Sequence, residues 1–170
     1  MNTSRKLLIA GVAALSAGAM ATSALAQASA TATGSANATI FKPITLTAVT
    51  PLNFGKLASD TTNPGSTTIS DSADSLSGTS NLTAISGTVT RAKFTLNGDA
   101  AATYTLTLPT AAVPMTGSGT GTVTLSSFTS NSPALTGSAI DLYVGATLNV
   151  SAGAGGGAWS ATFPVTVAYN

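Results

Sequence analysis

The sequence predicts an all-β protein built as an antiparallel β-sandwich. Thr residues alternate with Val, Leu, Ile, Phe and Tyr at period two in many segments, which is typical of strands buried on one face. Gly or Pro interrupts every long window, so no helical period of three and four is sustained. Turn sequences such as Asn63-Pro64-Gly65 and Asn131-Ser132-Pro133 separate the alternating segments. A disordered Ser- and Thr-rich stalk is the alternative, and the alternation argues against it.

Residues 1–26 have the pattern of a secretory signal peptide. A basic start precedes an apolar run, and Ala24 and Ala26 form a small-x-small cleavage site before Gln27. A transmembrane anchor is the alternative, but the run is interrupted and shorter than the ~20 apolar residues that a spanning helix needs. We therefore expect export through the periplasm, with the mature chain at the cell surface or outside the cell.

Residues 27–40 alternate small apolar with polar residues, ahead of a β-sandwich domain expected at residues 41–170. One interpretation is a flexible leader, since new N-termini are commonly disordered. The other is an extended segment that docks as a strand on another subunit, where the main chain supplies most of the attraction. This candidate donor strand would present its even positions: Ala28, Ala30, Ala32, Gly34, Ala36, Ala38 and Ile40.

The expected sandwich consists of short alternating strands with turns between them. Seven or more such strands favour an immunoglobulin-like topology. The strands are expected at residues 44–49, 52–57, 67–70, 82–86, 88–97, 103–108, 122–128, 140–151 and 159–170.

The last two of these strands have the clearest alternation. The even positions from Ile140 to Val150 are apolar and predict a buried face. After a Gly-rich turn at residues 153–157, the odd positions from Trp159 to Tyr169 are apolar, and no further strand pattern follows in the sequence. Pro164, on the opposite face, places this strand near an edge or a bulge.

Charged and catalytic residue types are scarce. Among 170 residues there are six Lys plus Arg, five Asp plus Glu, no His and no Cys. This excludes Ser-His and Cys-His nucleophile pairs, disulfides and the commonest zinc ligands. A formal net charge of +1 offers no basic stripe for nucleic acid. We therefore expect a non-enzymatic protein with no cofactor, no metal and no nucleic-acid partner.

Three smaller features have two interpretations each. Asp71 and Asp74 could supply oxygen ligands for Ca²⁺. The pair lacks both the number of charges and the spacing of a recognised calcium site, which favours a solvated loop. Arg91 and Lys93 are expected on the solvent face of a strand, where they discourage edge pairing. Trp159 has the ring to stack on a sugar, but its parity with the apolar positions favours the core.

Several motifs together resemble a family of small exported bacterial proteins catalogued only as a domain of unknown function. The Leu52-Asn53-Phe54-Gly55 step also resembles the spore coat protein U-like subunits of archaic chaperone–usher pili. Further matching segments are residues 36–40, 43–47, 92–98, 102–109, 145–150 and 163–170. The resemblance covers nearly the whole mature chain, but the chain lacks the Cys pair that such pilins often carry.

The pilin resemblance implies a sandwich that lacks its last strand. In such subunits a periplasmic chaperone first fills the resulting apolar groove, and the N-terminal extension of the next subunit fills it in the fibre, after passage through an outer-membrane usher. Pilins also tend to carry a Gly fourteenth from the end and an aromatic residue next to last. The acceptor groove implied here would include Gly157, Phe163, Val165, Val167 and Tyr169.

The working hypothesis from the sequence is a secreted structural subunit of a surface fibre. Its partners would be copies of itself or related subunits, with a chaperone and an usher by resemblance. The alternative is a self-contained extracellular β-sandwich module that binds a glycan or a matrix protein. In that case the N-terminal segment would pair within its own domain.

Overall fold

The computed structural model describes residues 29–100, 102–134 and 139–170. The chain divides into two units, Met1–Ala38 and Thr39–Asn170. In the first unit, residues 29–38 form no strand and their side chains are exposed. The predicted cleavage site at Ala24, Ala26 and Gln27 lies outside the described residues, as does Ala28 of the candidate donor strand.

The second unit is all-β, which confirms the predicted fold class, and the pairing of its strands is antiparallel. No helix among the described residues is long and apolar enough to span a bilayer. The strands are β1 (Thr45–Thr50), β2 (Asn53–Ser59), β3 (Gly65–Ile69), β4 (Leu76–Ser80), β5 (Leu82–Thr90), β6 (Ala92–Asn97), β7 (Tyr104–Thr107), β8 (Val113–Pro114), β9 (Thr116–Gly117), β10 (Val123–Ser130), β11 (Ala139–Val150), β12 (Trp159–Ser160) and β13 (Thr166–Tyr169).

One large sheet contains β1-β6-β11-β10-β8 in that order, with β3 pairing β11 and β4 pairing β3. Strand β11 is its centre, and Leu142, Val144 and Ala146 are fully buried there on the face that the alternation predicted. Three two-stranded sheets, β2-β5, β12-β9 and β13-β7, contribute the apolar side chains that pack against this face. The result is a sandwich-like core made of two neighbouring clusters, which share Leu52, Phe128 and Phe163.

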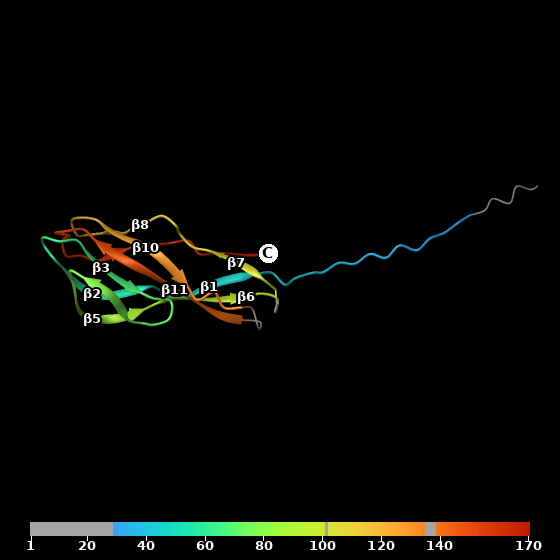
Figure 1. The fold of residues 1–170 in the computed structure, drawn as a ribbon, viewed down its shortest axis with the longest axis horizontal. Helices are drawn as coiled ribbons and strands as arrows, with labels where there is room; N and C mark the ends of the chain where they lie inside the picture. Colours follow the sequence, from blue (N-terminus) through green and yellow to red (C-terminus); the bar gives the residue numbers. More distant parts are fainter. Residues whose placement is uncertain (1–28, 101, 135–138) are drawn as a thin grey trace, which may run out of the picture. The chain divides into compact units, whose positions relative to one another are not determined.

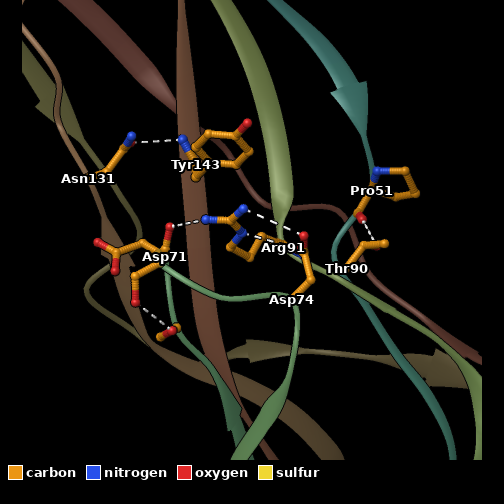
Figure 2. A network of polar contacts seen from close by, with 9 residues as sticks. Pro51, Asp71, Asp74, Thr90, Arg91, Asn131 and Tyr143 are labelled. Carbon is orange, nitrogen blue, oxygen red and sulfur yellow. Dashed lines mark hydrogen bonds and ion pairs between the residues drawn. The ribbon is translucent and has the colours of Figure 1, made fainter.

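The strand expected at residues 88–97 is divided between two sheets, and so is the segment that pairs with it. The expected strand at 88–97 is interrupted at Arg91, so that β5 pairs β2 while β6 pairs β1 and β11. The segment that pairs with it, residues 45–59, changes sheet at the same level. Strand β1 pairs with β6 in the large sheet, and β2 pairs with β5. The Thr90 hydroxyl donates to the Pro51 carbonyl oxygen at 2.8 Å and ties the two crossing points together (Figure 2).

The expected strand at 159–170 is paired only at its two ends. Trp159 and Ser160 pair with β9, and Thr166–Tyr169 pair with β7, whereas residues 161–165 lie in no ladder. The alternation of half-buried and exposed residues nevertheless runs through the whole segment. We call residues 159–169 the terminal segment. Short strands β4, β8 and β9 were not expected, because they are exposed or contain Pro114 and Gly117.

Candidate functional site

A groove of about 570 Å³ lies between β2 and the start of the terminal segment. One wall is formed by residues 52–57 and Ser59, and the other by residues 155–159. Apolar side chains from the core form the floor: Leu82, Met115, Val123, Leu148, Val150 and Ala154. Lys56 is the single charged residue among those that line it. The groove therefore offers an apolar surface of the kind that accepts apolar side chains.

The two walls of the groove differ: the first is the edge of β2, and the second is the loop that leads into the terminal segment, where only Trp159 belongs to a strand. Strand β2 pairs with β5 along one edge, and the described residues include no strand that pairs with its other edge. The terminal segment pairs with β9 and β7, likewise along one side. Unpaired edges present a row of backbone N–H and C=O groups to an additional strand. Edge groups above an apolar floor are the chemistry that strand addition uses, with the main chain giving affinity and the side chains specificity.

The Leu52-Asn53-Phe54-Gly55 step shapes the first wall. Leu52 contacts both core clusters, and the Phe54 side chain is buried in one of them. The Asn53 side-chain oxygen accepts a hydrogen bond from the Gly55 N–H at 2.9 Å, and Gly55 has a φ of 72°. Because L side chains rarely adopt this φ, glycine allows the bulge that sets the register of β2 against β5.

The groove is closed at the end of β2. The Ser59 hydroxyl donates to the Ala154 carbonyl oxygen at 2.9 Å, and the Gly153 N–H donates to the Asp60 carbonyl oxygen at 3.3 Å. The Asp60 carboxylate accepts from the N–H groups of Thr62 and Asn63 at 2.6 and 2.8 Å. These backbone donors lower the pKa of Asp60, Thr62 contributing most. The turn after β2 is thus fixed against the Gly-rich loop.

Of the five predicted acceptor residues, Gly157 lies in the loop before the terminal segment, and the other four lie along that segment outside the groove lining. Gly157 lines the groove, and an added Cβ there would lie 2.6 Å from the Gly119 backbone nitrogen, so this close approach needs glycine. Phe163 contacts both core clusters and Val165 contacts one of them. Val167 and Tyr169 are half-buried in β13. Trp159 lines the groove and packs against the core, as its parity predicted.

A second polar cluster surrounds Arg91 (Figure 2). Its guanidinium donates to the Asp74 carboxylate at 3.1 Å and to the Asp71 carbonyl oxygen at 2.9 Å, and lies 4.0 Å from the centroid of the Tyr143 ring. With 17% of its side chain exposed, Arg91 is not on the solvent face as predicted, because it fills the point where β5 and β6 separate. The loop carrying Asp71 and Asp74 is held by this arginine.

Two pKa shifts arise in and beside this cluster. The Arg91 backbone N–H and then its side chain lower the pKa of Asp74. Lys93 lies on the outer face and forms an ion pair with Asp141 at 2.9 Å, and this hydrogen bond raises the pKa of Lys93. No group of three metal-ligating side chains occurs in the part of the chain that the structure describes. Arg91 pairs with Asp74, and Lys93 beside it pairs with Asp141, so these contacts act as a structural clamp.

A family profile described as a domain of unknown function (DUF4402) matches residues 44–169. The chain belongs to this family. The match runs from the start of β1 to the end of β13 and so covers both walls of the groove. It confirms the predicted domain-of-unknown-function family. None of the curated proteins or solved structures compared with this DUF4402 chain matches it.

Proposed function

We propose that this DUF4402 protein is a secreted structural subunit of a surface fibre, assembled by strand donation between subunits. The observation that supports it is the apolar groove between the unpaired edge of β2 and the loop that leads into the terminal segment. An added strand in this groove would bring β5, β2, β12 and β13 into one continuous layer opposite the large sheet. By the resemblance to spore coat protein U-like pilins, a periplasmic chaperone would occupy the groove before an usher delivers the subunit.

The occupant of the groove is the N-terminal extension of another copy. Residues 28–40 are thirteen residues long, as are residues 157–169, which run from the second wall of the groove along the terminal segment. At ~3.3 Å per residue both span about 43 Å. The extension also carries its apolar residues at alternate positions, so that one face would meet the floor while Ser, Thr and Asn remain outside.

The test compares the mature chain, starting at Gln27, with a version that lacks residues 27–38. We expect the longer protein to form oligomers that resist mild denaturant and the shorter one to be monomeric. A synthetic peptide of residues 27–40 should bind the shorter protein with one peptide per chain, because its groove is free. Size-exclusion chromatography with light scattering measures both results. If both proteins remain equally monomeric and the peptide does not bind, strand donation is refuted and a self-contained binding module is favoured.

A further inference from the structure

Lys42 is held at the far end of the terminal segment by two hydrogen bonds, whose partners are joined by a third. The Lys42 N–H donates to the Asp99 carboxylate at 3.0 Å, and the Tyr169 hydroxyl donates to the Lys42 carbonyl oxygen at 2.9 Å. The Tyr169 hydroxyl in turn accepts from the Asp99 N–H at 2.7 Å. The Phe41 ring lies against the Tyr169 ring, with centroids 5.6 Å apart. We call this arrangement of Phe41, Lys42, Asp99 and Tyr169 the clasp.

The clasp fixes where the extension leaves its own domain. Trp159, beside the groove, is ten residues from Tyr169 along the terminal segment, which corresponds to about 33 Å of extended chain. Figure 1 shows the same separation, with β7 and the C-terminus at one end of this unit and β2 and β5 at the other. Ile40 precedes Lys42 by two residues, so its reach from the clasp is about 7 Å. Ile40 therefore cannot reach the groove of its own chain.

The extension carries a single large apolar side chain at its alternating positions, Ile40. The extension presents Ala and Gly at its apolar positions except for Ile40, whose side chain is 90% exposed. If the extension folded back along its own terminal segment, the residues level with Trp159 would be those about ten positions before Lys42, at Ala32 and its neighbours. An Ala side chain there would bury far less apolar area than Ile40 would.

We propose that the clasp makes Tyr169 a positioning residue that directs Ile40 into the groove of a second copy and not of its own chain. This inference rests on the proposed strand donation and specifies its direction. The donated segment then runs antiparallel to the terminal segment of the acceptor, with Ile40 beside Trp159. The clasp of the donor lies next to the Gly-rich end of the acceptor's groove.

Cysteine cross-linking tests this direction, because the native chain contains no Cys. Ala158 is suitable because it lines the groove and is exposed, whereas a side chain at Gly157 would collide with Gly119. Mature chains carrying Ile40→Cys are mixed with chains carrying Ala158→Cys and oxidised, and disulfide-linked peptides are quantified by mass spectrometry. A parallel mixture uses Ala32→Cys in place of Ile40→Cys. We expect the Ile40 pair to exceed the Ala32 pair about tenfold.

The possible outcomes distinguish a wrong direction of the donated strand from a complete absence of strand donation. A predominant link from Ala32 between chains would overturn the inference and leave strand donation intact. An efficient disulfide within single chains carrying both Ala32→Cys and Ala158→Cys would show that the extension folds back, which also overturns it. If no pair links chains and deletion of residues 27–38 leaves the oligomeric state unchanged, the proposed function itself fails.

The role of Tyr169 is tested by Tyr169→Phe, which keeps the ring against Phe41 and removes the hydroxyl. In chains that carry both Ala32→Cys and Ala158→Cys, this substitution should increase the intrachain disulfide at least several-fold. Tyr104→Phe is the matched control, since Tyr104 lies opposite Tyr169 in the ladder and donates to the Pro133 carbonyl oxygen, away from the clasp. Equal intrachain disulfide in all three proteins would refute the positioning role.

Discussion

Replacing Gly145 with Ala is expected to destabilise the domain by about 3 kcal/mol. Gly145 lies in β11, where the chain just after β3 passes directly over it. A Cβ added there would lie 2.2 Å from the Ile69 carbonyl oxygen and 2.6 Å from the Ser70 carbonyl carbon. Both are backbone atoms, and β3 is fixed against β11 by the adjacent pair Ala146 and Ile69. The collision cannot be relieved without separating the strands.

Urea unfolding at one protein concentration measures this loss, and the melting temperature should fall by roughly 10 °C. Gly156→Ala is the control, because a Cβ at Gly156 meets nothing within 4 Å. This control should change the free energy of unfolding by less than about 0.5 kcal/mol. Similar stability of the Gly145 variant and the control would mean that β3 and β11 are not paired in this register.

Replacing Ile40 with Asp is expected to weaken association between subunits by at least ~100-fold. In the proposed assembly Ile40 is the one large apolar side chain that the extension places on the groove floor. An Asp carboxylate at that position would lose its hydration against Met115, Leu148 and Trp159, which line the groove. Because the Ile40 side chain is 90% exposed in the single chain, the substitution should leave the domain fold unchanged.

The adjacent variant Thr39→Asp provides the control for Ile40→Asp. It adds the same charge one position earlier, on the polar face of the extension, where the carboxylate would stay in water. Sedimentation velocity over a range of concentrations compares the two. Equal loss of oligomers in both variants would indicate a general effect of charge, and equal retention would remove Ile40 from the interface.

The sequence predicted most strand positions and the buried face of the sandwich. In β11, alternation of apolar and polar residues places Leu142 and Val144 inward, since period two leaves a single face for the core. The positions at which strands change sheet were not predicted. The break at Arg91 depends on contacts with Asp74, Asp71 and Tyr143, which are far from it in sequence.

Of the acceptor residues that the pilin resemblance implied, Gly157 lines the groove, and Phe163, Val165, Val167 and Tyr169 do not. The other wall, β2, follows only from the topology. The hydrogen bonds of the clasp were also not predicted from the sequence. Tyr169 was singled out as a groove residue, but its bonds to Lys42 and Asp99 join residues 127 and 70 positions away. No local pattern reveals such pairings.

Amide hydrogen exchange of residues 161–165 shows whether a donated strand pairs with the terminal segment. These residues lie in no ladder, so the N–H groups of the four that are not proline should exchange quickly in the protein that lacks residues 27–38. Adding the peptide of residues 27–40 is expected to slow exchange both there and along β2, while a peptide carrying Ile40→Asp should not. Unchanged exchange at both walls in the presence of excess native peptide would contradict the account, because an added strand must bond to those edges.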